Sequence, residues 1–245
     1  MSSYIAELVE KVEQIKKAGW HETTRIGNTG IGKTFEDLLE KEEDNISSPD
    51  FYDIEIKTHE VASSSMLTLF TKSPTYPRNA NTLLRTNYGK VDEYGNKILH
   101  TTVSGNRRTN SSAYDYDFQI EIDYANEAVR LAVFDKSKLL VNDSVYWSFT
   151  ALENQIMRKL NTTAVVSAES KIETGRKYYR YTHIDLVTGL SIDGLLDGIE
   201  QGDLKVDIRI GAYHRGPNIG KTHDHGTGFR INTIKLLKYA NVARI

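Results

Sequence analysis

The sequence contains no cysteine, which excludes disulfides, thiolate zinc sites and cysteine nucleophiles. Any bound metal must therefore be held by oxygen or imidazole ligands. Long apolar runs are also missing: no stretch reaches the roughly 18–20 consecutive apolar residues of a membrane helix, and the amino terminus does not resemble a secretory signal. With 245 residues, the chain can bury a sizeable core in one domain or in two lobes. We therefore expect a globular, cytoplasmic protein without a membrane partner.

A large excess of one charge is missing too, since the formal net charge is −2. The charges are nevertheless unevenly distributed. Residues 36–60 contain ten acidic residues and two lysines, whereas residues 205–245 contain eight Lys or Arg and two Asp. The acidic run at residues 40–44 is typical of a solvated helix end. The basic segment also contains histidines and glycines, which makes it the better candidate for a functional surface.

Apolar spacing predicts amphipathic helices over residues 3–17 and 34–43, the second capped by Thr34. A short strand is predicted over residues 52–57, paired with a more apolar strand over residues 66–70. Residues 79–113 are polar and rich in turns, and a lobe boundary falls in or after them. The remaining predicted elements are a hairpin (118–123 with 129–134), two helices (152–160 and 192–200) and three strands (163–166, 178–183 and 204–210).

Residues 27–34 read Gly-Asn-Thr-Gly-Ile-Gly-Lys-Thr and satisfy the nucleotide-binding pattern G-x-x-x-x-G-K-[ST]. A phosphate-binding loop of this kind follows a buried strand and leads into a helix. Here the preceding residues 20–25 are polar, so a P-loop nucleotide hydrolase is a minor alternative and we expect no nucleotide cofactor. A glycine turn before a helix N-terminus can equally approach a DNA phosphate.

The segment with catalytic character is Pro49-Asp50 followed by Glu55-Ile56-Lys57. On a strand, residues two apart project from the same face about 6.6 Å apart, so Glu55 and Lys57 share one side while Ile56 points to the core. Two carboxylates in one place repel each other unless a hard cation lies between them. We expect Mg²⁺ between Glu55 and a second carboxylate, activating a water for phosphodiester hydrolysis, with Lys57 orienting that water or stabilising negative charge.

Two alternatives stay open at this point. Glu-x-Lys alone is typical of an ordinary surface strand, and Pro-Asp before it strengthens the catalytic interpretation only somewhat. Asp53 competes with Asp50 as the first carboxylate, because Asp53 is expected on the same strand face as Glu55, whereas Asp50 must reach in from the bend after Pro49.

With these motifs the chain resembles the MutH/MvaI-like branch of the PD-(D/E)xK nucleases. The resemblance implies an α/β fold with a mixed sheet flanked by helices and a second, DNA-recognition lobe. It also implies that Asp50 is the first carboxylate, and we then expect Mg²⁺ at Asp50, Glu55 and Ile56. The resemblance further implies that Glu36 supplies an auxiliary acid, although an ordinary helix position beside the core is an equal alternative for Glu36. We expect the catalytic part approximately within residues 1–110 and the recognition part mainly within 111–245. The resemblance is carried by residues 30–40, Asp50, Glu55, Lys57, 207–209 and 223–230.

Several polar residues near the carboxy terminus match the edges of DNA bases. Arg donates to guanine, a carboxylate accepts from cytosine N4, and His can donate to guanine. Alone, the His-x-His pair could also be a metal pair or part of a plain polar loop. The resemblance favours major-groove recognition and implies the target CC(A/T)GG. The candidates are Asp207, Arg209, His223, His225 and Arg230.

Arg107 and Arg108 lie in a polar loop that would suit contact with phosphates or the minor groove, and a solvated turn is the simpler alternative. Together with these patterns, the resemblance implies a type II restriction endonuclease that acts on double-stranded DNA. We expect it to be a monomer, because the central A·T pair of the implied target breaks two-fold symmetry. A cognate DNA methyltransferase acts on the same site but need not bind the protein. A DNA-binding protein that has lost catalysis is the main alternative.

Overall fold

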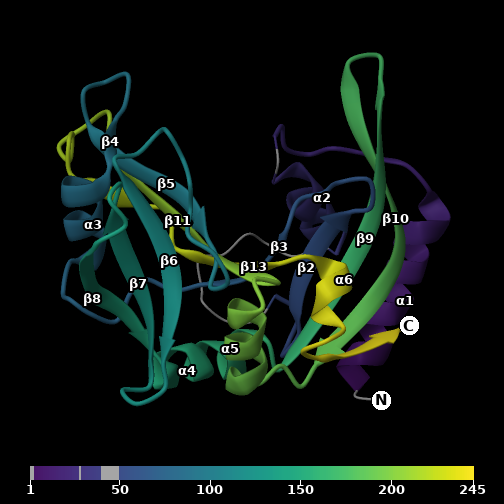
Figure 1. Ribbon diagram of the computed structural model, residues 1–245. Coiled ribbons are helices and arrows are strands. Elements are labelled where there is room, and N and C mark those ends of the chain that lie inside the picture. Colours follow the sequence, from purple (N-terminus) through teal and green to yellow (C-terminus); the bar gives the residue numbers. More distant parts are fainter. Residues whose placement is uncertain (1–2, 28, 40–49) are drawn as a thin grey trace. The chain divides into compact units, whose positions relative to one another are not determined.

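The computed structural model describes residues 3–27, 29–39 and 50–245, and it divides into two compact units (Figure 1). Unit 1 comprises Met1–Leu67, Met157–Leu190 and Ala240–Ile245, and unit 2 comprises Thr68–Ile156 and Ser191–Tyr239. Each unit therefore combines segments that are distant in sequence. The assignment of catalysis and recognition to either side of about residue 110 stays a prediction. No helix in the described ranges is long and apolar enough to cross a membrane.

Unit 1 is built on a mixed sheet, as the sequence predicts. Strands β9 (Thr162–Glu173) and β10 (Arg176–Thr188) form a long antiparallel hairpin, visible as the green pair in Figure 1. Thr174 and Gly175 both have positive φ, 51° and 79°, as a two-residue hairpin turn requires. Strand β2 (Glu55–Glu60) pairs parallel to β9, which places the starts of both strands at the same edge of the sheet. The short strands β1 (His21–Glu22) and β14 (Asn241–Arg244) pair with β10.

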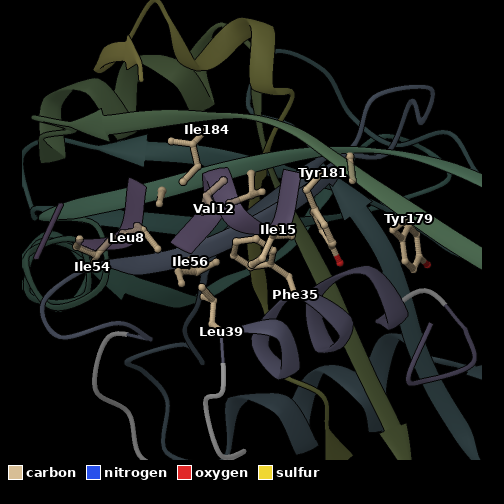
Figure 2. Packing of buried hydrophobic residues seen from close by; sticks show 13 residues of the cluster. Leu8, Val12, Ile15, Phe35, Leu39, Ile54, Ile56, Tyr179, Tyr181 and Ile184 are labelled. Carbon is tan, nitrogen blue, oxygen red and sulfur yellow. The ribbon is translucent and has the colours of Figure 1, made fainter. Parts of the chain in front are cut away.

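One face of this sheet is buried against α1 (Ser3–Ala18) and α2 (Gly30–Leu38). Figure 2 shows the cluster, in which Leu8, Val12 and Ile15 of α1 meet sheet residues that include Ile56. Burying each aliphatic side chain of this size contributes about 1.5–3 kcal/mol. Since Ile56 points into this core, as predicted, Glu55 and Lys57 project from the opposite face.

The first helix is confirmed, whereas the start of the second is corrected. Helix α2 begins at Gly30, so Thr34 is an interior residue and does not cap it. Thr34 is 1% exposed, and its hydroxyl accepts a hydrogen bond from the Thr24 amide at 3.1 Å. The predicted continuation of this helix over residues 40–43 lies outside the described residues.

The predicted pairing of residues 52–57 with 66–70 is wrong. Strand β2 begins only at Glu55, and β3 (Leu67–Thr71) belongs to the main sheet of unit 2, where it pairs with β13 (Gly228–Ile231). Apolar packing decides between the two partners. Phe70 of β3 stacks on Phe229 of β13 with ring centroids 4.8 Å apart, whereas Ile56 of β2 packs in the core of unit 1.

Unit 2 contains two sheets. The larger has the order β3-β13-β11-β5-β4, with β12 also paired to β11, and the smaller is the antiparallel meander β6-β7-β8. The predicted hairpin is confirmed as β6 and β7, with Asp123 opposite Ala128. The bounds are β4 (Lys90–Val91), β5 (Lys97–Val103), β6 (Tyr116–Asp123), β7 (Ala128–Asp135), β8 (Leu140–Ser148), β11 (Leu204–Ala212) and β12 (Thr222–Asp224).

The helices of unit 2 include one that the sequence reading missed. Helix α3 (Ala80–Tyr88) and strand β5 lie within residues 79–113, which we predicted to be mostly turns. Ala80, Leu84 and Tyr88 recur every four residues and are all buried, so the helical signal was present but diluted by polar neighbours. The predicted helices at 152–160 and 192–200 are confirmed as α4 (Phe149–Lys159) and α5 (Ile192–Glu200). A short helix, α6 (Thr233–Leu236), follows β13.

Candidate active site and recognition cluster

A tight turn directly before β2 determines where the strand begins. Phe51 and Ile54 exchange backbone hydrogen bonds of 2.9 and 2.8 Å, and Tyr52 between them has a φ of 53°. Asp53 is therefore an exposed turn residue and does not share a strand face with Glu55, contrary to the prediction. Asp50 instead lies against the strand, because its Oδ2 accepts a hydrogen bond from the Ile56 amide at 2.9 Å.

The carboxylate of Glu55 is buried and held by two lysines. Glu55 is 5% exposed; its Oε1 accepts a hydrogen bond from Lys57 Nζ, and its Oε2 accepts one from Lys159 Nζ at 3.0 Å. Lys57 is the residue that the E-x-K spacing predicts. Lys159 was missed, because its proximity to Glu55 follows only from the parallel pairing of β2 with β9.

Oxygen donors suitable for a hard divalent cation lie at the start of β2. Asp50 and Glu55 supply carboxylates, and Ile56 can supply its backbone carbonyl. Thr163 is the register partner of Glu55 on β9, and its buried hydroxyl has no hydrogen-bond partner in the described part of the chain. No three His, Asp or Glu side chains converge as a metal site within the described ranges. The donors fit Mg²⁺, which commonly binds through one or two carboxylates with waters and substrate phosphates.

The predicted auxiliary acid, Glu36, lies on α2. Gly32 of the same helix faces Thr58 of β2, with a Cβ at Gly32 lying 3.4 Å from the Thr58 hydroxyl, so α2 covers the face of β2 that carries Ile56. Burial, followed by the negative charges of neighbours that include Glu36, raises the pKa of Tyr181. The role of Glu36 as an auxiliary acid stays a prediction.

The glycine turn before α2 differs from a nucleotide-binding loop. Lys33 Nζ lies 2.6 Å from Asp37 Oδ1, and this ion pair lowers the pKa of Asp37. The Thr34 hydroxyl is bonded to the Thr24 backbone, as described above. The preceding strand β1 is a two-residue edge strand rather than a central buried one. The lysine and threonine that a P-loop directs to phosphate and Mg²⁺ are therefore engaged within the fold.

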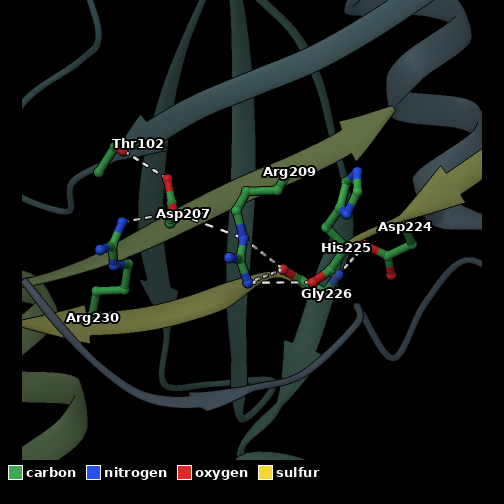
Figure 3. Close-up of polar contacts among 7 residues, drawn as sticks. All are labelled: Thr102, Asp207, Arg209, Asp224, His225, Gly226 and Arg230. Atoms are coloured by element: carbon green, nitrogen blue, oxygen red, sulfur yellow. Dashed lines mark hydrogen bonds and ion pairs between the residues drawn. The ribbon is translucent and has the colours of Figure 1, made fainter. Parts of the chain in front are cut away.

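In unit 2 the predicted recognition residues Asp207, Arg209, His225 and Arg230 gather in one place (Figure 3). Asp207 of β11 is 8% exposed and accepts hydrogen bonds from Thr102 Oγ1 at 2.8 Å and Arg230 Nη1 at 3.0 Å. Arg209 Nε lies 3.8 Å from the same carboxylate. One carboxylate thus binds one guanidinium group and lies close to a second, and this arrangement is suited to reading base edges. Thr102, the register partner of Asp207 on β5, was missed from sequence.

Arg209 also anchors the loop that carries the histidines. Its Nε and Nη2 donate to the Gly226 carbonyl at 3.1 and 3.0 Å, and Asp224 Oδ1 accepts from the Gly226 amide at 2.8 Å. Gly226 has a φ of 79°, and a Cβ there would approach Thr71 at 3.1 Å, so both backbone and space favour glycine. The loop is therefore fixed relative to Arg209.

Three histidines gather beside this loop. The rings of His223 and His225 are 4.2 Å apart, and His100 of β5, the register partner of Arg209, lies 6.4 Å from His225. Loss of hydration lowers the pKa of His225, and the positive charges of His223, His100 and Arg209 act in the same direction. The lowered pKa favours the neutral imidazole of His225, which has one donor and one acceptor nitrogen. The lining of a pocket of about 480 Å³ is His100, Thr101, Thr102, Asp207, Ile208, Arg209 and His225.

Arg107 and Arg108 line a second pocket of unit 2, about 390 Å³ in volume, together with Lys205 and several hydroxyl side chains. Their environments differ. The Arg108 guanidinium lies 3.5 Å from the centre of the Phe134 ring and donates to the Lys138 carbonyl at 3.3 Å. Arg108 is thus partly engaged in packing within unit 2, whereas Arg107 is exposed, and the contact of either residue with DNA stays a prediction.

A mixed sheet that carries two carboxylates and a lysine at the start of one strand defines the PD-(D/E)xK class of nucleases. Residues 9–238 match the sequence model of the MvaI/BcnI restriction endonuclease family. The chain belongs to this family. It is therefore a type II site-specific deoxyribonuclease that acts on double-stranded DNA. Restriction endonucleases generally require a divalent metal ion.

Two solved structures of the restriction endonuclease MvaI are similar to the chain. The complex with cognate DNA substrate is 63% identical with a TM-score of 0.94, covering 100% of this chain and 99% of that chain. The structure in the absence of DNA is 62% identical with a TM-score of 0.69, covering 100% and 98%. No curated protein matches the chain.

Proposed function

We propose that this endonuclease hydrolyses DNA at CC(A/T)GG, using Mg²⁺ held by Asp50, Glu55 and the Ile56 carbonyl. The observation that carries the catalytic part is the position of Glu55, buried beside Lys57 at the strand start where Asp50 hydrogen-bonds to Ile56. The target follows from the resemblance to MvaI-like enzymes, and the similar MvaI structure contains its cognate DNA substrate.

Each catalytic side chain has a distinct task in this proposal. Mg²⁺ held by Asp50, Glu55 and the Ile56 carbonyl would supply positive charge and would make a water near the scissile phosphate more acidic. Asp50 presents its carboxylate because the Ile56 amide fixes one of its oxygens, and Glu55 presents its own from the adjacent strand position. Lys57 Nζ donates a hydrogen bond to the attacking water or to a phosphate oxygen, where negative charge develops in the transition state. Glu36 would provide an auxiliary acid from α2.

The recognition cluster would read the G·C pairs. Arg209 and Arg230 are suited to guanine O6 and N7, and Asp207 is suited to cytosine N4. The Asp207 carboxylate holds Arg230 and the Gly226 carbonyl holds Arg209 before DNA binds, which reduces the entropy lost on binding. His223 and His225 would add donors or acceptors at the same groove, and Arg107 would contact phosphates or the minor groove, with Arg108 beside it.

The direct test compares two plasmids that differ only in a single CC(A/T)GG site. With Mg²⁺, the protein should linearise the plasmid that contains the site and leave the other intact, and chelation with EDTA should stop cleavage. Cleavage of both plasmids at equal rates would contradict the proposed target. A mobility shift without cleavage, in Mg²⁺ or Mn²⁺, would instead favour a DNA-binding protein that has lost catalysis.

We also propose that the protein acts as a monomer, because the central A·T pair is compatible with two-fold symmetry only approximately. A single active site must cut the two strands in succession. Supercoiled plasmid should therefore pass through an open-circular intermediate before it becomes linear. A dimeric mass on DNA by light scattering, together with linear product formed without a lag, would contradict this.

A further inference from the structure

A second lysine contacts the catalytic carboxylate, and neither the sequence motif nor the proposed mechanism uses it. Lys57 holds Oε1 of Glu55, whereas Lys159 Nζ holds Oε2 at 3.0 Å. The side chain of Glu55 is 6% exposed and that of Lys159 is 17% exposed. A buried carboxylate is stable only when its oxygens are hydrogen-bonded, so each oxygen has its own cation.

The helix before Lys159 and the strand after it fix the position of its backbone. Lys159 is the last residue of α4 and is followed by the buried Leu160, and β9 begins at Thr162, three residues after Lys159. Because β9 runs parallel to β2, with Glu55 opposite Thr163, the end of α4 arrives at the same sheet edge as the start of β2. A lysine at a helix C-terminus is also favoured by the helix dipole. The backbone of Lys159 is therefore held close enough to Glu55 for the two side chains to form a hydrogen bond.

We propose that Lys159 is a positioning residue for cleavage, which holds the Glu55 carboxylate in one orientation by binding the oxygen that Lys57 does not hold. This inference rests on the proposed catalytic role of Glu55. Lys57 alone leaves the carboxylate free to rotate about its last side-chain bond, whereas two cations on two oxygens restrict that rotation. A carboxylate fixed before DNA binds loses less entropy when the metal site assembles.

The test compares Lys159→Met, which keeps the length and removes the charge, with Lys159→Arg, which keeps both charge and donors. Arg158→Met is the matched control, since Arg158 is an exposed neighbour on the same helix and the variant loses the same charge. The measurements are kcat and KM for a cognate duplex with Mg²⁺, calorimetric titration of the protein–DNA complex with Ca²⁺, and the thermal midpoint. Removal of a residue that orients a metal ligand typically costs about 10–100-fold in activity or metal affinity.

We expect Lys159→Met to lower kcat about 10–100-fold and to weaken Ca²⁺ binding, with KM nearly unchanged. Lys159→Arg should recover most of the loss, and Arg158→Met should behave as wild type. A kcat for Lys159→Met equal to that of the control would overturn the inference. So would equal losses in both Lys159 variants accompanied by a lowered thermal midpoint, because that pattern indicates a structural ion pair. Where Lys159→Met does not fold, Lys159→Gln takes its place with the same criteria.

Glu55→Gln in the same assays separates this inference from the proposed function. If Glu55→Gln cleaves as fast as wild type, the catalytic assignment itself fails. If Glu55→Gln is inactive while Lys159→Met is fully active, only the positioning role of Lys159 fails.

Discussion

Replacing Asp207 by Asn tests the recognition cluster at its centre. Asn keeps the shape of the side chain and an oxygen that can accept from Thr102, but it removes the charge that pairs with Arg230 at 3.0 Å and lies 3.8 Å from Arg209. In the wild type, one carboxylate partly neutralises two guanidinium groups. In Asp207→Asn the cluster gains one unit of positive charge and loses an acceptor for cytosine.

The structure limits how large the effect on folding can be. Breaking a fully buried ion pair costs about 3–5 kcal/mol. Here the side chains of Arg209 and Arg230 are 37% and 28% exposed, so water screens their interaction with Asp207. The free energy of unfolding should therefore fall by about 1 kcal/mol in Asp207→Asn. The effect on the ratio of cognate to random affinity should be larger than the effect on folding. Loss of one base contact removes about 1–3 kcal/mol of discrimination, which is about 5–150-fold in the ratio of affinities.

The assay is equilibrium binding to a CC(A/T)GG duplex and to a random duplex over a range of salt, with Ca²⁺ in place of Mg²⁺. Asp207→Asn should bind random DNA at least as tightly as wild type, because one more positive charge faces the phosphates. Its cognate-to-random ratio should fall by the amount given above. An unchanged ratio would refute the assignment of Asp207 to base recognition.

Three further predictions concern the rest of the chain. Asp50→Ala should lose cleavage activity, whereas Asp53→Ala should stay within a few-fold of wild type in plasmid cleavage, and similar rates in both would reject Asp50 as the first carboxylate. Calorimetry should detect no micromolar binding of ATP or GTP to the wild type, because Lys33 is paired with Asp37; such binding would revive the P-loop alternative. Asp203→Asn should lower the thermal midpoint by a few degrees at pH 7, because hydrogen bonds from Lys238 and Lys235 lower the pKa of Asp203. This stabilisation is fully present above the usual aspartate pKa of about 3.9 and is lost as the pH falls from there through the much lower pKa of folded Asp203. The gap between the two midpoints should therefore narrow progressively below about pH 4, and a gap as large at pH 2 as at pH 7 would contradict the assignment.

The parts of the fold that sequence predicts correctly are those with strong local signals. The α1 helix has buried Leu8, Val12 and Ile15 on one stripe, and the β6-β7 hairpin has a clear turn. The prediction fails where packing between distant segments decides. Strand β2 was paired with its neighbour in sequence, but its partner is β9, about a hundred residues further along. Short-range patterns contain no information about such a choice.

The same distinction applies to the candidate site. Glu55 and Lys57 follow from a spacing of two residues, and Asp50 followed from the resemblance. Asp53 was a rival only because the strand was expected to begin before it, whereas the Phe51–Ile54 turn places it at an exposed position. Lys159 could not be found locally, since nothing near it in sequence indicates a carboxylate. The helix end and the parallel strand together bring it to Glu55.

The central claim is that Glu55 and Lys57 act in cleavage rather than in DNA binding. It is tested most directly by measuring, for Glu55→Ala and Lys57→Ala, both single-turnover cleavage with Mg²⁺ and affinity for the same cognate duplex. We expect cleavage to fall by at least about a hundredfold in each variant, while the affinity for the cognate duplex stays within a few-fold of wild type. Near-wild-type cleavage by either variant would contradict the account.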